Sequence, residues 1–314
     1  MSVRLFDWRD LPALLRYRNR GLFLDKALVL TRGTVLVPAG ALLSYFAPAT
    51  GIFTYLCTDD CGFEKPLIGQ VMHTSSSSFA RLSFLAPKEA LDSNAFSHLL
   101  EYMFVQVGER GAYYLLAEVD EQSTAFETLR QNSFAIYARQ RIWQLEGDPI
   151  GEIQSTPWRA GIDRDLIAAR SLYNNLVPGL VQQVEQPPTD HLKGPVYDQG
   201  DNLLAYVEIK YGTRGIWVQP FIHPDAENIG DRLADLFLNL PNRRSRPIYI
   251  CVRSYQSWLE SHIENLGAKA SPLQSVMVKH LAVTKKVTQS LPLRALEAGH
   301  PEATAPFARS ESKK

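Results

Sequence analysis

Hydrophobic and polar positions in the first half of the chain change their spacing several times. Continuous or alternating apolar runs predict strands, whereas apolar side chains that recur every three or four positions predict helices. Ser93 or Asn94 precedes the first helical stretch as a cap. The predicted elements, in chain order, are a strand at 80–87, a helix at 95–107, a strand at 113–119, a helix containing Phe126 and Leu129, and a strand ending at Leu145.

The second half repeats this order of elements. Its predicted elements are a strand at 215–224, a helix at 230–238, a strand at 247–252, a helix containing Trp258, Leu259, Ile263 and Leu266, and a strand at 275–281. Gly267 follows the last helix, where glycine suits a C-terminal cap. The spacing also agrees, since Pro87 and Pro224 are 137 positions apart and Val119 and Val252 are 133 apart. This internal repeat predicts two copies of one α/β domain.

A polar, turn-rich stretch at 146–152 separates the two copies. We therefore expect an N-terminal domain at 1–147 and a C-terminal domain at 152–283. The length of 314 residues allows each domain a core of its own. From about Thr284 the chain becomes polar and loses its periodicity, which predicts a disordered tail at 284–314.

The charge balance narrows the classes of partner. The chain has 33 Lys plus Arg and 33 Asp plus Glu, so its formal net charge is zero. Such a balance gives no overall attraction to nucleic acid or to an anionic membrane surface. A partner must therefore be recognised by a local site, and the sequence leaves both a monomer and a homodimer open.

The cysteines and the N-terminus predict a cytoplasmic location. Three cysteines, Cys57, Cys61 and Cys251, are too few for a disulfide framework, and with His73 they do not complete a zinc site. The N-terminus lacks the apolar core of a signal peptide. Thr34–Thr58 has no charged residue over 25 positions, but prolines and glycines interrupt it. Short strands are therefore favoured there, with a membrane-spanning helix as the minority alternative.

The order strand, proline-closed loop, helix, strand, helix, strand, with a last helix that ends at Gly267-Ala268, resembles the GNAT superfamily of N-acetyltransferases. The resemblance covers the later two-thirds of each half. It implies two tandem α/β domains, each a mixed, mostly antiparallel sheet flanked by helices. It also implies acetyl-CoA, or another acyl-CoA, as the co-substrate, and a small-molecule or protein amine as the acceptor.

The same resemblance implies a cofactor loop in the second half. In that family a strand feeds a loop of the form Gln/Arg-x-x-Gly-x-Gly/Ala, where backbone N–H groups and the helix dipole hold the pyrophosphate of acetyl-CoA. Here Gly230 takes the second glycine place and Asn228 the first, since asparagine accepts a left-handed backbone. The implied cofactor-binding residues are Val218, Phe221, Ile222, Asn228, Ile229, Gly230 and Asp231.

Two features of this loop leave an alternative open. The loop is shorter than the family pattern, and Asp225, Glu227 and Asp231 add negative charge where a pyrophosphate would lie. A plain helix N-terminus with acidic residues in its first turn is therefore an equal alternative. The corresponding stretch of the first half, 87–95, contains no glycine, so we expect a structural role for that copy.

Acetyl transfer to an amine needs a base for the amine and often an acid for the leaving thiolate. Many members of the family carry the acid as a tyrosine four residues before the glycine that ends the last helix. The matching positions here are Ile263 and, in the first half, Leu129, and neither side chain titrates. Tyr255 is the substitute acid, with aromatic packing as the alternative.

Two residues of the second half are candidates for the base. Glu208 lies on the predicted strand 204–210, and a solvent-facing strand residue is the alternative reading of its position. His223 lies directly before Pro224, at the end of the predicted strand 215–224, and a loop histidine without a catalytic role is the alternative. Neither assignment follows from the spacing alone.

Two functions follow from these observations. The first is an acyl-CoA-dependent N-acyltransferase of the GNAT type, with the cofactor in the second domain. The rival is a non-catalytic tandem GNAT-like protein that binds a ligand or a partner. The absent acid tyrosines and the acidic loop favour the rival, whereas Asn-Ile-Gly at 228–230 favours the enzyme. The sequence contains no motif for a dinucleotide, a phosphate loop, a zinc protease or a serine hydrolase.

Overall fold

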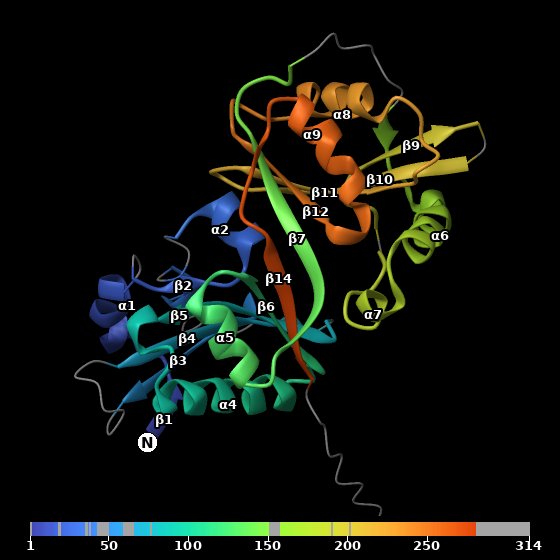
Figure 1. Ribbon diagram of the computed structural model, residues 1–314. Helices are drawn as coiled ribbons and strands as arrows, with labels where there is room; N and C mark the ends of the chain where they lie inside the picture. Colours follow the sequence, from blue (N-terminus) through green and yellow to red (C-terminus); the bar gives the residue numbers. More distant parts are fainter. Residues whose placement is uncertain are drawn as a thin grey trace, which may run out of the picture. The chain divides into compact units, whose positions relative to one another are not determined.

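The computed structural model describes residues 2–17, 20–34, 37, 39–42, 50–58, 66–75, 77–150, 158–189, 191–200 and 202–280. Its strands form a 14-stranded sheet flanked by helices (Figure 1). The strands are β1 (Ser2–Leu5), β2 (Leu22–Phe23), β3 (Ile52–Thr58), β4 (Leu67–Met72), β5 (Phe79–Ala86), β6 (Tyr114–Asp120), β7 (Ala135–Leu145), β8 (Arg159–Ala160), β9 (Pro195–Gln199), β10 (Asn202–Tyr211), β11 (Ile216–Ile222), β12 (Ile248–Arg253), β13 (Lys269–Ala270) and β14 (Gln274–His280).

Helices lie between these strands, and they include more than the four that the repeat predicts. The α-helices are α1 (Leu11–Tyr17), α2 (Lys26–Arg32), α4 (Asn94–Glu109), α5 (Thr124–Gln131), α6 (Leu166–Leu176), α7 (Gly179–Gln182), α8 (Ile229–Leu238) and α9 (Glu260–Asn265). The 3-10 helices are η1 (Trp8–Asp10), η3 (Lys88–Ala90), η4 (Asp163–Asp165) and η5 (Ser254–Leu259).

Hydrogen bonds order the sheet as β1-β3-β4-β5-β6-β14-β7-β12-β11-β10-β9-β8, with β2 beside β5 and β13 beside β7. The pairs β5 with β6 and β11 with β12 are parallel, and the other pairs are antiparallel. The predicted mixed, mostly antiparallel sheet flanked by helices is therefore confirmed.

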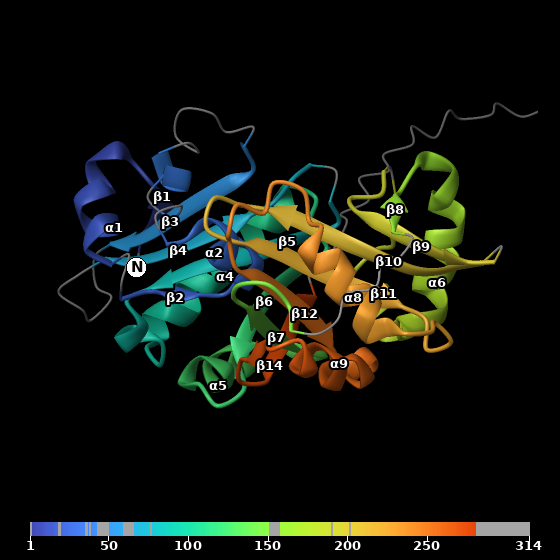
Figure 2. The ribbon, with the colours of Figure 1, turned by 90° about the horizontal axis from the view of Figure 1, so that it is seen from above.

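The two halves exchange their last strands at the centre of the sheet. β7 of the first half pairs with β12 of the second, while β14 of the second half pairs with β6 of the first. β7 and β14 also pair with each other, and Figure 1 and Figure 2 both show them side by side. The described parts of 1–147 and 152–283 thus share one sheet.

Amphipathic helices cover the sheet and form its two largest cores. In the first half α4 is capped by Ser93, whose Oγ accepts a hydrogen bond from Phe96 N at 3.3 Å. It buries Phe96, Leu99 and Met103 against the strands. In the second half α8 and α9 pack over Val218 and its neighbours on β10 to β12. The helical spacing of apolar residues in the sequence corresponds to these buried faces.

Each predicted element is present, with small differences in its bounds. The helix that contains Trp258 begins as η5 and becomes α-helical at Glu260, and Gly267 ends it with a φ of +89°. Part of Thr34–Thr58, Cys61, the link at 151–157 and the tail from 281 lie outside the described residues. Within the described ranges, no helix is long and apolar enough to cross a membrane.

Candidate functional site

The parallel strands β11 and β12 separate before they end, and this opens the sheet in the second half. They pair over Ile216–Val218 and Ile248–Ile250, and then continue to Ile222 and Arg253 without pairing to each other. In open α/β sheets, ligands bind outside the carboxyl ends of strands where neighbouring strands diverge. This divergence is therefore a candidate ligand site.

The side chain of Gln256 bridges backbone groups at this divergence. Gln256 lies in η5 and is 1% exposed. Its Nε2 donates a hydrogen bond to Pro220 O at 2.8 Å, and its Oε1 accepts one from Ile222 N at 2.9 Å. The amide thus gives β11 the donor and the acceptor that a neighbouring strand would give. A ligand that carries an amide in an extended chain would use the same two backbone groups.

The loop after β11 turns into α8 through a left-handed residue. Asn228 has φ 53° and ψ 42°, a conformation that asparagine adopts more readily than most residues. The first hydrogen bond of the helix runs from Arg232 N to Asn228 O at 3.1 Å. The N–H groups of Ile229, Gly230 and Asp231 therefore lie at the helix start, as at any helix N-terminus. Such groups, with the helix dipole, attract an anion.

A Cβ atom would fit at Gly230, beside this helix start. A Cβ atom added to Gly230 would meet one neighbour within 4 Å, the Nδ1 atom of His262 at 3.6 Å. The side chains of Asp225, Glu227 and Asp231 are exposed around it and oppose an anion. Arg232 adds a positive charge nearby, and its guanidinium lies 3.9 Å from the ring centroid of Tyr197.

The remaining predicted cofactor residues divide between the two faces of the sheet. Val218, Ile222 and Ile229 belong to the core under α8 and α9. Phe221 belongs to the core on the opposite face, which α6 covers. Of the predicted set, only Asn228, Gly230 and Asp231 are therefore not buried in the described structure.

Tyrosines gather on the face covered by α6. The tyrosine cluster consists of Tyr137, Tyr173, Tyr206 and Tyr255 around Phe221. The ring centroids of Tyr173 and Tyr206 lie 5.5 Å and 6.0 Å from that of Phe221. Burial raises the pKa of Tyr206 to about 12, and nearby Glu208 adds to this shift. These phenols therefore keep their protons at neutral pH.

An ion pair lies beneath the same cluster. Arg253 is 3% exposed, and its Nη2 donates to Glu185 Oε1 at 2.6 Å. Tyr137 Oη donates to the same oxygen at 2.5 Å, and Tyr173 Oη donates to the Glu185 carbonyl at 2.7 Å. Burial alone would raise the pKa of Glu185, but Arg253, Tyr137 and Arg81 outweigh it and hold that pKa below its usual value.

The predicted base Glu208 lies on the tyrosine side of the sheet. It is the register partner of Gln219 on β11, and side chains directly opposite each other share a face. Its carboxylate lies 3.3 Å from Lys210 Nζ, and the side chain is 25% exposed. Its charge also contributes to the raised pKa of Tyr173, after burial and other neighbours.

Tyr255 and His223 lie at the same end of the divergence, on η5 and just after β11. The hydroxyl of Tyr255 is buried and meets no hydrogen-bond partner among the described residues. Burial, the largest influence, raises the pKa of Tyr255. His223 Nδ1 accepts a hydrogen bond from Asp225 N at 3.2 Å, which leaves Nε2 for another group. The structure thus places Glu208 beside the tyrosine cluster to which Tyr255 belongs, and His223 at the mouth of the divergence.

The first half has a similar divergence, but its own chain fills it. β5 and β6 pair over Phe79–Arg81 and Tyr114–Leu116 and then separate. β2 runs into this gap and pairs with β5, and Leu24 N continues the pairing with a hydrogen bond to Ser83 O at 3.0 Å. The segment 20–26 thus takes the place of a strand.

Glu118 on β6 closes the other side of this gap. Its N–H donates to Leu24 O at 2.8 Å, and its Oε2 accepts a hydrogen bond from Lys26 N at 2.8 Å. Arg81 lies 3.4 Å from the other carboxylate oxygen. Burial, with Asp25 nearby, raises the pKa of Glu118 despite these partners. The segment is therefore hydrogen-bonded to both strands.

Sequence reasoning missed the polar residues that organise both gaps. Arg81, Glu118 and Arg253 are charged residues inside or at the end of apolar runs that predict buried strands. A charged residue is rarely buried unless it is paired, so these positions did indicate buried polar contacts. Gln256 and Glu185 carried no such signal, because both lie in polar stretches that look like surface. Their burial depends on contacts between residues far apart in the chain.

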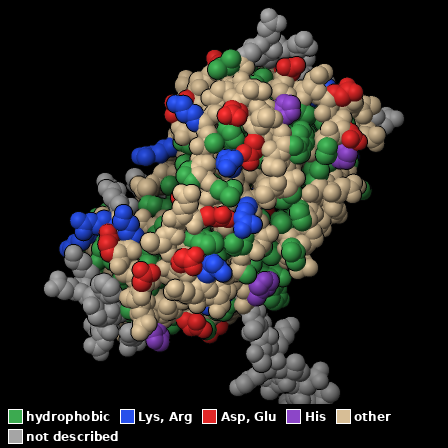
Figure 3. Space-filling model, in the orientation of Figure 1, with side chains coloured by type: hydrophobic (Ala, Val, Ile, Leu, Met, Phe, Trp, Pro, Cys, Tyr) green, Lys and Arg blue, Asp and Glu red, His purple; other side chains and the backbone are tan. Residues whose placement is uncertain are grey.

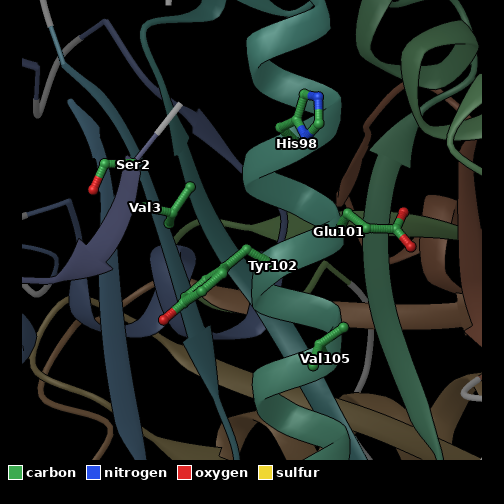
Figure 4. A pocket seen from close by; sticks show the side chains of 6 residues that line it. All are labelled: Ser2, Val3, His98, Glu101, Tyr102 and Val105. Atoms are coloured by element: carbon green, nitrogen blue, oxygen red, sulfur yellow. The ribbon is translucent and has the colours of Figure 1, made fainter. Parts of the chain in front are cut away.

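Two hollows elsewhere on the surface are poorer candidates. A hollow of about 550 Å³ lies between β1 and α4, lined by Ser2, Val3, His98, Glu101, Tyr102 and Val105. Figure 4 shows Tyr102 pointing toward the β1 side of α4 and Glu101 pointing away from it, so the polar groups do not converge. Glu101 also pairs with Lys279 at 3.6 Å.

The second hollow, of about 730 Å³, lies beside the C-terminal part of α8, away from the helix start. Trp158, Lys193 and Asp235 are among the residues that line it.

Lys and Arg gather at the left of the face in Figure 3, and elsewhere on that face both signs are interspersed. Across the described part of the chain, no group of three or more His, Cys, Asp or Glu residues could hold a metal ion.

Comparison with solved structures identifies the fold. A GCN5-related N-acetyltransferase from Sphaerobacter thermophilus superposes with a TM-score of 0.54 over 89% of this chain and 95% of its own, at 12% identity. The tandem GNAT protein from the clavulanic acid biosynthesis pathway, solved without AcCoA, gives a TM-score of 0.52 over 89% of this chain and 98% of its own, also at 12% identity.

The chain has a tandem GNAT fold. The resemblance seen in the sequence is thereby confirmed at the level of the fold. No protein-family model and no curated protein matches the sequence. Because a fold hosts many activities, the function of this chain must be argued from its own residues.

Proposed function

We propose that the chain is an acyl-CoA-dependent N-acyltransferase, with acetyl-CoA as the co-substrate in the second half. The junction of β11 and α8 carries this proposal. There the diverging strands lead through the left-handed Asn228 to a helix start where Gly230 is partly exposed and where an added Cβ would fit. A phosphate group would meet N–H groups and the positive end of the helix dipole at this point.

The divergence itself suits the rest of such a ligand. The arm of coenzyme A is an extended chain with two amide groups, and Pro220 O and Ile222 N present one acceptor and one donor to the gap. Gln256 satisfies both groups in the unliganded chain, so a bound arm would replace its amide. The first half offers no comparable opening among its described residues, because segment 20–26 fills its gap. We assign that half a structural role.

The chemistry requires one proton to leave the amine. The amine nitrogen attacks the thioester carbon, a C–N bond forms, the C–S bond breaks, and coenzyme A leaves as a thiolate. His223 Nε2, at the mouth of the divergence, and Glu208, beside the tyrosine cluster, are the groups that could take the amine proton. Tyr255 is a poor acid for the thiolate, because burial raises its pKa above the ordinary phenol value and further above that of a thiol.

Calorimetric titration with acetyl-CoA tests the proposal. Gly230→Phe places a ring over the helix start, and Gly230→Ala is the matched control with a Cβ that the structure accommodates. Glycine is unfavourable inside a helix, so neither change should lower the melting temperature. We expect binding to the wild type and to Gly230→Ala, and loss of binding in Gly230→Phe. No binding to the wild type at millimolar acetyl-CoA would refute the proposal.

A second candidate function is a non-catalytic GNAT-fold protein that binds a partner. The hydrogen-bonded Gln256 favours it, because both strand gaps are then closed by the chain itself. Glu208→Ala and His223→Ala separate the two functions. For an enzyme, at least one of them should abolish transfer to an amine while the melting temperature stays the same. Binding of acetyl-CoA without transfer to any amine, in the wild type, would favour the second function.

A further inference from the structure

A buried arginine under α6 has more hydrogen-bond donors than the described residues can satisfy. Arg253 is 3% exposed and uses Nη2 for Glu185. Its Nε and Nη1 are buried and meet no acceptor in the described structure. The hydroxyl of Tyr255, two positions later, is also buried without a partner there. Arg253 lies close enough that its charge partly offsets the raised pKa of Tyr255.

Glu185 does not balance these donors. Its Oε1 already accepts from both Arg253 and Tyr137, so this one oxygen serves two donors. Arg81 is paired separately with Glu118 on the first half. A buried donor without an acceptor costs free energy, and native proteins rarely retain several of them in one place. The surplus of donors therefore points to an acceptor that arrives from outside.

The missing acceptor has a defined chemistry. Guanidinium groups match the two oxygens of a carboxylate, and a phenol donates to the same kind of oxygen. Arg253 is the last residue of β12, so its donors lie at the divergence where an acyl group would arrive. The rings of Tyr173, Tyr206 and Phe221 pack in the same cluster and keep bulk water away.

We propose that Arg253 and Tyr255 bind the carboxylate of the amine acceptor, so that the acceptor is an amino acid or another amine with an acid group. The role of this molecule as the acceptor rests on the proposed function, whereas the binding of its carboxylate does not. The Glu185 side chain is only 15% exposed and is paired with Arg253. A carboxylate can therefore reach Arg253 only if the chain after α7 makes a small movement. Glu208 lies on the same face of the sheet, near enough to Tyr173 for its charge to raise the pKa of that phenol further.

The test follows arginine Nε–H signals of the ¹⁵N-labelled full chain by NMR. The probes are glycine, L-alanine and β-alanine, each compared with its amide, which lacks the carboxylate. We expect saturable shifts with the acids and none with the amides. Arg253→Lys identifies the affected signal.

Tyr255→Phe removes one unpartnered hydroxyl and keeps the ring. It should weaken acid binding about tenfold, the effect of one hydrogen bond to a charged group, without lowering the melting temperature. Tyr206→Phe is the matched control, because its hydroxyl already accepts a hydrogen bond from Lys193 N at 3.1 Å. That variant should bind the acids as the wild type does.

The outcomes separate this inference from the proposed function. Acid binding that is unchanged in Tyr255→Phe, or equal for acids and amides, overturns the site. A melting temperature lowered by several degrees in Tyr255→Phe also overturns it, because the hydroxyl then has a partner in the unliganded protein. If the acids bind and acetyl-CoA does not, the carboxylate site stands and the acyltransferase function falls. If acetyl-CoA binds and no acid does, the reverse holds.

Discussion

The amide of Gln256 offers the sharpest test of how the second half is held together. Gln256→Leu keeps the approximate size of the side chain and removes both hydrogen bonds to β11. Pro220 O and Ile222 N would then be buried without partners. Each buried group left unsatisfied costs about 1–3 kcal/mol, so the free energy of unfolding should fall by about 2–6 kcal/mol.

Thermal unfolding followed by circular dichroism measures this effect. For a chain of this size each kcal/mol shifts the melting temperature by roughly 2–4 °C, so a fall of at least about 4 °C is expected. Gln122→Leu, at an exposed position, is the control and should shift it by less than about 2 °C. A fall in Gln256→Leu no larger than the control would show that the amide does not bridge the strand, and the reasoning would be refuted.

Three further predictions concern single residues. Glu185 has a lowered pKa, so it stabilises the fold above its unfolded value of 4.5 and loses that contribution as the pH falls through its folded value. Glu185→Gln should therefore flatten the acid side of a plot of unfolding free energy against pH, and an unchanged slope would contradict the lowered pKa. Asn228 has a left-handed backbone, so Asn228→Gly should leave the melting temperature nearly unchanged, whereas Asn228→Val should destabilise the fold by about 1–2 kcal/mol. Equal stabilities of the two variants in urea denaturation would contradict backbone strain in Asn228→Val. Cys251 is buried, and burial raises its pKa to about 12. A thiol reagent should therefore label Cys251 in urea and not in the native protein, and fast labelling of Cys251 in the native protein would contradict its burial.

The sequence predicted the elements and the fold because both depend on local patterns. Apolar spacing placed α4 and α8, and the internal repeat placed the strands that flank them. The left-handed conformation of Asn228 also followed from residue type in a short loop. These features need no knowledge of distant contacts.

The strand exchange and the filled gaps could not be predicted in the same way. Segment 20–26 meets Glu118 more than ninety positions later, as in the hydrogen bond from Lys26 N. Nothing in the composition of 20–26 distinguishes it from a surface strand. Gln256 looks like a surface residue of a short helix, but the structure buries it and hydrogen-bonds it to the backbone of β11. The roles of Glu208, His223 and Tyr255 stay predictions for the assays above.

The exchange of β7 and β14 also sets the order in which the chain can complete its structure. During synthesis, the edge of β6 that faces away from β5 has no partner until residues 274–280 have left the ribosome. That edge belongs to a buried, apolar strand, which is the kind of edge that pairs with other chains when exposed. A chain shortened before Gln274 should therefore aggregate even though the whole first half is present. β14 prevents this by covering the edge of β6.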